Sequence, residues 1–155
     1  MRGHPAFLEE LKRPELICDC CSREIMHLGN AITAHNEWKE KFRAAIAGQD
    51  TVDTASISAD NHCALGKWLQ GEGARLFGKL TSHADCVATH KIFHLEAGKI
   101  ADAINNRNFG EAENMLGTDA PFSGTSKALA AAILRLKRDA IDSPGITSLI
   151  AKLSE

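Results

Sequence analysis

The sequence contains no tyrosine and few other aromatic residues, although 44% of it is apolar. Long runs of β-branched residues are also absent, whereas alanine and leucine are frequent, and this bias favours helices. No apolar stretch approaches the roughly 20 residues that span a bilayer, and the first residues lack the apolar run of a signal peptide. We therefore expect an all-α, cytoplasmic protein that does not insert into a membrane.

An excess of charge of one sign is also missing. The net charge is −2, and acidic and basic residues are mixed along the chain, so no nucleic-acid patch is expected. The sequence shows no repeat, low-complexity linker or glycine-rich phosphate loop. A chain of 155 residues is therefore expected to form one domain, 1–155.

Apolar residues recur at steps of three and four, the spacing of a helix with one buried face. The first helix has such a seam, with Lys39 as its one gap: Cys21, Ile25, Leu28, Ile32, His35, Phe42 and Ile46. The expected elements are helices at about 15–48, 61–70, 74–106, 109–116 and 124–141, with a polar loop at 49–59 and a turn at 117–124. This pattern predicts an antiparallel helical bundle of about four to five helices, with a short helix inserted between the first two long ones.

Three histidines occupy seam positions that a bundle ordinarily fills with apolar residues. His35 lies on the first helix, and His90 and His94 lie one turn apart on the third. A buried imidazole without a partner costs about 1–3 kcal/mol, and one shared metal ion would satisfy all three. Cys63 follows a predicted helix cap, Asp60, in the first turn, where the helix dipole is expected to lower the thiol pKa. Three imidazoles and one thiolate predict a closed tetrahedral zinc site, which suits binding or sensing better than hydrolysis because no position is left for water.

The other histidines and cysteines fit this site less well. His83 lies one heptad before His90 and is a possible substitute ligand, whereas His4, His27 and His62 are expected at the surface. Cys86 is expected to be an ordinary small helix residue. The segment Cys18-Asp19-Cys20-Cys21 lacks the roughly two to four residues that separate paired zinc ligands, so the role of its cysteines stays open.

Two tryptophans and two lysines flank the predicted ligands in the sequence. Trp38 and Trp68 are expected to pack as lids over the apolar rim of the site, and Lys39 and Lys67 to face solvent.

The motifs around these residues resemble a known family. They are His35-x-x-Trp38-Lys39, Asp60-x-x-Cys63-x-Leu65-Gly66-Lys67-Trp68 and His90-x-x-x-His94, with Gly71-Glu72-Gly73 and Phe122-Ser123 between and after them. In this combination they are similar to the chemoreceptor zinc-binding (CZB) domain of bacteria. The resemblance covers about residues 25–137, and residues 1–14 and 142–155 are expected to be peripheral.

The resemblance implies a fold, a cofactor and partners. It implies an all-helical bundle, often a homodimer, with zinc bound by His35, Cys63, His90 and His94. CZB domains are usually attached to a chemotaxis transducer or a diguanylate cyclase, whose output changes when zinc binds or when the zinc-bound cysteine is oxidised. The 155 residues leave no room for such an output domain, so a stand-alone member and an excised domain are both open.

Several other functions compete with a zinc sensor. A redox switch would use the same four residues. A metal-assisted hydrolase is disfavoured because His90-Lys91 does not match the His-Glu of metalloprotease helices, and a di-iron bundle would need a seam carboxylate. We therefore do not expect an enzyme. A structural helical-bundle interaction module whose histidines and cysteine are not ligands is the remaining alternative, and the same ligand set would also accept cobalt or copper.

Overall fold

The computed structural model describes residues 19–142, and it describes side chains from Leu28 onward. The expected peripheral segment 1–14, and all but the first residue of 142–155, lie outside the described residues. Every regular element in the described part is a helix, as predicted for an all-α protein. None of these helices is long and apolar enough to cross a membrane.

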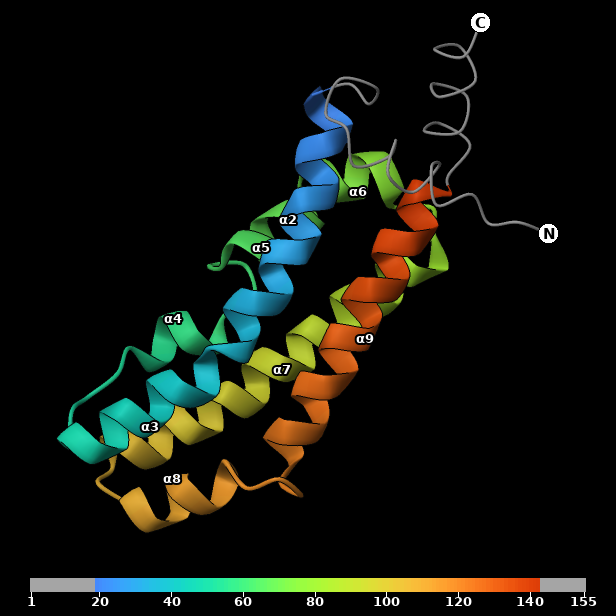
Figure 1. Cartoon of the computed structure of the whole chain (residues 1–155). Helices are drawn as coiled ribbons and strands as arrows, with labels where there is room; N and C mark the ends of the chain where they lie inside the picture. Colours follow the sequence, from blue (N-terminus) through green and yellow to red (C-terminus); the bar gives the residue numbers. More distant parts are fainter. Residues whose placement is uncertain (1–18, 143–155) are drawn as a thin grey trace, which may run out of the picture.

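The helices form four antiparallel arms. In Figure 1 the chain runs along α2 and α3, returns through three short helices, runs back along α7 and returns again along α9, with α8 crossing one end. The bounds are α2 Asp19–Asn36, α3 Trp38–Gly48, α4 Thr54–Ser58, α5 Ala64–Gln70, α6 Glu72–Phe77, α7 Thr81–Asn105, α8 Phe109–Met115 and α9 Pro121–Ile141. The predicted antiparallel bundle is therefore confirmed, but three short helices, rather than one, make up the second arm.

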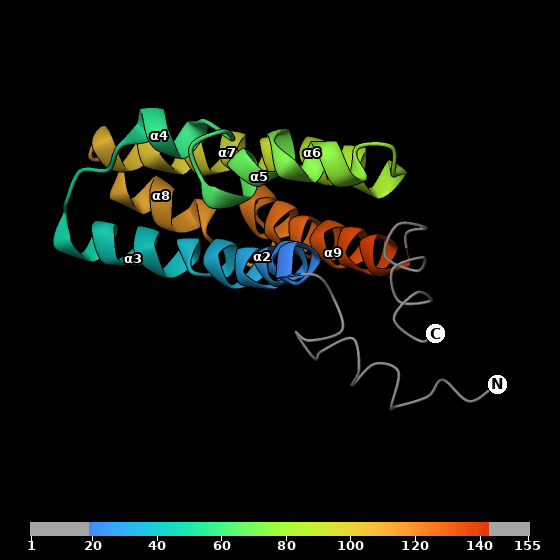
Figure 2. The same cartoon turned by 90° about the horizontal axis from the view of Figure 1, so that it is seen from above.

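The core lies where α7 packs against α9 and where α9 packs against α2. Figure 2 shows α4, α5 and α6 lying along α7, on the side of the bundle opposite α2 and α3. Residues that recur at steps of three and four on α9 and α7 are buried: Leu129, Ile133, Leu136, Ala140, His83, His90, His94, Ala97, Ala101 and Ile104. The helical period was therefore a sound guide to the buried face of both helices.

The predicted first helix, 15–48, is interrupted at Glu37. The backbone N–H of Glu37 still donates to Thr33 at 3.2 Å, and that of Lys41 donates to Glu37 at 3.1 Å. These bonds keep α2 and α3 in one nearly continuous arm. The interruption falls next to Asn36, a weak helix former, and His35 lies in the last turn before it.

The predicted loop 49–59 contains a helix, α4. The Asp53 side chain caps it, because Oδ1 accepts from the Ser56 backbone N–H at 3.3 Å and Oδ2 accepts from the Ser56 hydroxyl at 2.7 Å. The Thr, Ser and Asp residues that indicated a loop are here the cap and first turn of a helix.

The predicted helix 74–106 is divided into α6 and α7. Leu80 has an extended backbone, with φ −78° and ψ 135°, so the helical path ends before it and α7 starts at Thr81. Gly78 closes α6, where a Cβ atom would lie 2.3 Å from the Ala74 carbonyl oxygen. The apolar period continues through this break and therefore hid it from the sequence.

The last long helix begins earlier than predicted. Pro121, which was assigned to a turn at 117–124, is the first residue of α9, where its missing N–H is no loss. The hydroxyl of Ser123 donates to the Gly117 carbonyl at 2.7 Å and ties this helix start to the preceding turn. The predicted helix 109–116 agrees with α8 and the following Leu116, which is fully buried.

Candidate metal centre

Four side chains from three helices meet inside the bundle. They are His35 near the end of α2, Cys63 at the start of α5, and His90 and His94 on α7. One ligand atom from each lies within 4.8 Å of all the others. The three histidines are buried and the cysteine is half-buried. The residues that the sequence singled out are thus brought together by the fold.

The distances between these atoms can be compared with those around a tetrahedral zinc ion. Bonds of roughly 2.0–2.1 Å to nitrogen and 2.3 Å to sulfur place two nitrogens about 3.3 Å apart and a nitrogen about 3.6 Å from the sulfur. The Cys63 Sγ lies 3.1 Å from His90 Nε2, 3.5 Å from His94 Nε2 and 3.9 Å from His35 Nε2. The Nε2 atoms of His90 and His94 are 3.0 Å apart. These spacings are those of a ligand set around one small ion, so the residues present fit zinc.

Backbone carbonyls set the orientation of two of the imidazoles. Nδ1 of His35 lies 2.7 Å from the Ala31 carbonyl oxygen, and Nδ1 of His94 lies 2.7 Å from the Ile57 carbonyl oxygen. A carbonyl oxygen can only accept, so each Nδ1 carries the proton and each Nε2 keeps its lone pair for a metal. The sequence did not predict these two partners, because every residue has a backbone carbonyl whatever its side chain.

The environment keeps the imidazoles neutral. Burial lowers the pKa of His90 to about 3, and the neighbouring His94 and His35 add to the effect. Burial also lowers the pKa of His35 and of His94, although the hydrogen bonds to Ala31 and Ile57 oppose it. Neutral imidazole is the form that binds metals, so the three rings are ready as ligands near neutral pH.

Cys63 differs from its prediction in two respects. It is itself the cap of α5, since its Sγ accepts from the Gly66 backbone N–H at 3.3 Å, and the predicted start of this helix after a cap at Asp60 is wrong. Burial raises the pKa of the metal-free thiol, opposed by the N–H groups of Gly66 and Leu65, so the predicted lowering is also wrong. Burial disfavours the charged thiolate more than the N–H groups at the start of α5 favour it. A nearby cation is therefore needed to keep Cys63 as a thiolate.

Gly66 explains how the chain turns into α5 beside the site. A Cβ atom at this position would lie 1.6 Å from the Asp60 carbonyl oxygen. Only glycine therefore lets the segment before Cys63 pass over the first turn of α5 and bring the sulfur toward the histidines.

The remaining candidates lie apart from the cluster. His83 is buried, but its Nε2 lies 2.9 Å from the Leu69 carbonyl oxygen, so it fastens α7 to α5 rather than substituting as a ligand. His62 is exposed, as predicted. Cys86 is fully buried, and burial raises its pKa to about 12, which makes it an unreactive thiol. Cys18 lies outside the described residues, as do the side chains of Cys20, Cys21 and His27, and the prediction for them stays untested.

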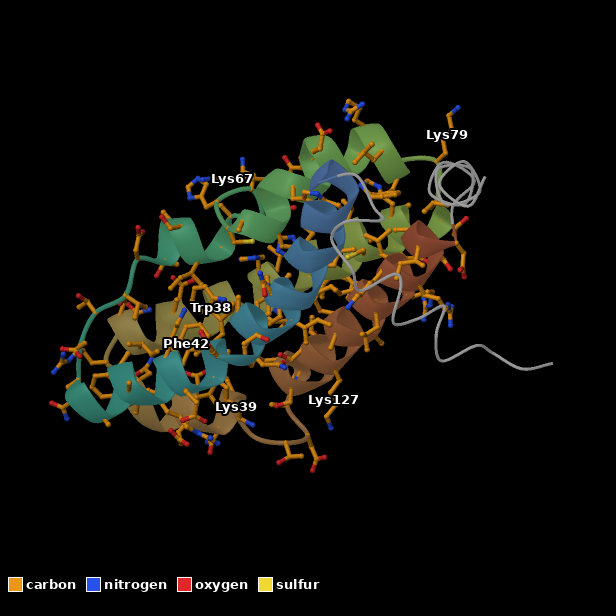
Figure 3. All side chains as sticks on the ribbon, turned by 45° about the horizontal axis from the view of Figure 1, so that its top comes forward. Trp38, Lys39, Phe42, Lys67, Lys79 and Lys127 are labelled. Atoms are coloured by element: carbon orange, nitrogen blue, oxygen red, sulfur yellow. The ribbon has the colours of Figure 1, made fainter. Side chains whose placement is uncertain are left out.

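Phe93, rather than a tryptophan, packs against the ligand rings. Its ring centroid lies 5.0 Å from that of His35 and 5.5 Å from that of His94. Trp38 packs instead on Phe42, with both side chains projecting from α3, as Figure 3 shows. Phe93, and not a tryptophan as predicted, therefore makes the aromatic contact with the ligand rings.

The flanking lysines and the second tryptophan also differ in part from their predictions. Trp68 packs on Phe77 of α6. Lys67 projects into solvent as expected, whereas Lys39 is half-buried.

The part of the chain that carries the four clustered residues matches a known family of domains. The family model described as the chemoreceptor zinc-binding domain matches residues 35–101. The match starts at the first clustered residue and includes the other three, but it is shorter than the expected 25–137. Neither a curated protein nor a solved structure matches this chain. Residues 35–101 thus match the CZB family of zinc-binding domains, with a His3Cys cluster positioned to bind a metal ion, and the predicted family and cofactor are confirmed.

Proposed function

We propose that this chain is a sensory domain that binds zinc through His35, Cys63, His90 and His94 and transmits the state of the site to a signalling output. The observation that carries the proposal is the convergence of one sulfur and three Nε2 atoms from α2, α5 and α7. Zinc bound there supplies the positive charge that holds Cys63 as a thiolate. Because the metal would join three separate helices, its binding would change how those helices are held together.

The short helix α5 is the element that we expect to respond. It has only seven residues and carries Cys63 at its start, whereas α2 and α7 are long helices packed against α9. Zinc should therefore slow backbone hydrogen exchange in residues 63–70 more than in the α7–α9 core. The Cys63→Ala variant should lose this difference while remaining folded. Equal protection of 63–70 with and without zinc in the wild type would contradict the proposal.

Oxidation of Cys63 is a second input that the structure favours, because the sulfur is half-buried and Cys86 is fully buried. Hydrogen peroxide would convert the thiolate to a sulfenic acid: the sulfur gains one oxygen and loses two electrons, and the remaining peroxide oxygen leaves as hydroxide. This oxidation would remove one zinc ligand.

Peroxide should therefore release zinc from the wild type and from the control variant Cys86→Ala, and zinc release can be followed with a chromogenic chelator. In Cys63→Ser, residual bound zinc should not respond to peroxide. Zinc retained in oxidised wild type, or release that persists in Cys63→Ser, would refute the redox input.

The output that we propose is a chemotaxis transducer or a diguanylate cyclase in the cytoplasm. This assignment rests on the family match. Bacterial cells expressing Cys63→Ala in place of the wild type should differ in swimming response or in cyclic dinucleotide level. If both measurements are unchanged across a range of zinc concentrations, this output is wrong.

We do not propose an enzyme. Four protein ligands complete a tetrahedral zinc site and leave no place for a reacting water. The cluster also contains no carboxylate, which a di-iron site of the bundle type would need.

A homodimer is the assembly that we propose. Ile92, Leu95 and Leu134 are 51%, 52% and 55% exposed, on two helices that pack together and are joined by the Arg135–Asp85 ion pair. A second copy would cover these apolar side chains. Sedimentation should show a dimer for the wild type and for the control Lys67→Glu, which changes an exposed residue of α5, and a monomer for Leu95→Glu. A monomeric wild type would contradict this assembly.

A further inference from the structure

The short helix α4 lies along α7, as Figures 1 and 2 both show. The carbonyl of Ile57, near the end of α4, accepts the hydrogen bond from His94 Nδ1 at 2.7 Å. The opposite nitrogen of that ring, Nε2, lies 3.0 Å from His90 Nε2 and 3.5 Å from Cys63 Sγ. The position of α4 therefore decides where the ligand nitrogen of His94 points.

Gly98 determines how closely α4 can approach α7. It lies one turn after His94 and is buried. A Cβ atom at Gly98 would lie 2.3 Å from Ser58 Oγ and 3.1 Å from Ser58 Cβ. A Cβ atom there would force the Ser58 hydroxyl to rotate and would press on Ser58 Cβ, so that this residue must shift by a few tenths of an ångström. Ser58 is bonded directly to Ile57, whose carbonyl orients His94.

The other end of α4 is held independently. Asn105, at the end of α7, donates from Nδ2 to the Val52 carbonyl at 2.8 Å and to the Thr54 hydroxyl at 2.9 Å. Its Oδ1 accepts from the Val52 backbone N–H at 2.8 Å. The segment 52–58 is thus fixed at one end by Asn105, and its other end lies against α7, where Ser58 is next to Gly98 and the Ile57 carbonyl meets His94.

We propose that Gly98 is a positioning residue of the metal site: by admitting Ser58, it keeps the Ile57 carbonyl on His94 Nδ1 and aims His94 Nε2 at the metal. The inference rests on the proposed zinc binding, but it concerns a residue that is not itself a ligand. It also gives α4 a role in the site, although the sequence predicted a loop there.

The test is the Gly98→Ala variant of the full chain. Loss of a partner that orients a metal-bound histidine typically weakens metal binding about 10- to 100-fold. We expect the zinc affinity of Gly98→Ala, measured by chelator competition, to fall at least tenfold. In the metal-free protein, the His94 Nδ1–H resonance in 15N-edited NMR spectra should move toward the position of a solvent-exposed imidazole N–H. The matched control is Gly124→Ala, which adds the same methyl group to a long helix where nothing lies within 4 Å.

A second substitution separates this mechanism from a general loss of stability. Ser58→Gly removes both clashing atoms and leaves Ser58 Cα, 3.5 Å from the new Cβ, as the nearest neighbour. The double variant Ser58→Gly/Gly98→Ala should therefore recover most of the zinc affinity and the His94 resonance. If Gly98→Ala does not fold, Ser58→Leu displaces the same end of α4 with α7 unchanged, and it should also lose at least tenfold in affinity.

Three results would overturn the inference. They are wild-type zinc affinity in folded Gly98→Ala, an affinity loss that Ser58→Gly does not restore, and wild-type affinity in Ser58→Leu. Failure of the proposed function is distinguishable, because the wild-type protein itself would then bind no zinc.

Discussion

At the scale of single residues, the site depends on groups that shape the backbone as much as on the ligands. Gly66 lets the segment before Cys63 cross the start of α5, because the Asp60 carbonyl oxygen occupies the space that a Cβ atom at position 66 would need. The N–H of the same residue also donates to the Cys63 sulfur. A substitution at Gly66 therefore affects both the fold and the placement of the thiol.

The Gly66→Ala variant tests this dependence. The added methyl group cannot fit without moving backbone, and such overpacking typically costs about 1–3 kcal/mol. We expect the free energy of unfolding of the metal-free protein to fall by about this amount in denaturant titrations, with weaker zinc binding. Gly110→Ala is the control, because nothing lies within 4 Å of its added methyl group. Unchanged stability in Gly66→Ala would show that the Asp60 segment moves aside without cost.

The buried histidines predict how stability depends on pH. The pKa of His90 is lowered to about 3 in the folded state, against an ordinary value of about 6.5 in the unfolded chain. Between these values the unfolded chain binds more protons, so stability is fully present above about pH 6.5 and is lost as the pH falls toward 3. For this one histidine, the loss between pH 7 and pH 5 is about 1–2 kcal/mol.

Denaturant titrations of the metal-free protein across this pH range check the prediction. The His90→Leu variant should show a weaker pH dependence than the wild type. The exposed His62→Gln variant should behave as the wild type does. The same slope in wild type and His90→Leu would mean that His90 does not stay neutral in the folded protein.

The four clustered residues could be predicted because their signal lies in residue type and spacing. His35, His90 and His94 stand in apolar seams, and the period that located those seams also located the histidines. The carbonyl partners, Ala31 and Ile57, could not be predicted, since any residue carries a carbonyl. The raised pKa of Cys63 was not predicted, because the position of a residue in the sequence does not show how deeply its side chain is buried.

At the scale of elements, the second arm holds most of the differences from prediction. The helix α4 is five residues long and largely polar, so its cap at Asp53 was its sole sequence signal. The break before Leu80 was hidden because the apolar period continues through it, and the break at Glu37 was hidden because the period resumes in register at Phe42 after one gap at Lys39. Short helices of this kind are stabilised by tertiary contacts, which a local pattern does not contain.

Asn105 provides a test of how α4 is held. Its side chain makes three hydrogen bonds to residues 52 and 54. A hydrogen bond of this kind contributes about 0.5–1.5 kcal/mol net, so loss of the three together should change the local opening equilibrium roughly tenfold or more. Asn105→Ala should therefore speed backbone hydrogen exchange in 52–58 at least tenfold, whereas the neighbouring exposed Asn106→Ala should not. Equal exchange in both variants would show that Asn105 is not what holds α4.

At the scale of the whole molecule, the bundle and the metal cluster support each other. The packing of α2 and α7 on α9 brings His35 to the α7 histidines, and α5 adds the cysteine from the second arm. The antiparallel bundle could be predicted because several long amphipathic helices joined by short connections have few other ways to bury their seams. We expect the bundle to stay folded without metal, because most of its apolar core, including Leu129, Ile133 and Leu136 of α9, is built from side chains that are not ligands.

The most direct test of the central claim is the zinc content and zinc affinity of the purified protein, compared among wild type, Cys63→Ala, His90→Ala and the control Cys86→Ala. Four residues around one ion predict about one zinc per chain in wild type and Cys86→Ala, and strong loss in the two ligand variants. Circular dichroism should show that all four proteins are folded. Absence of zinc from the wild type, or zinc retained in both Cys63→Ala and His90→Ala, would contradict the four-ligand site.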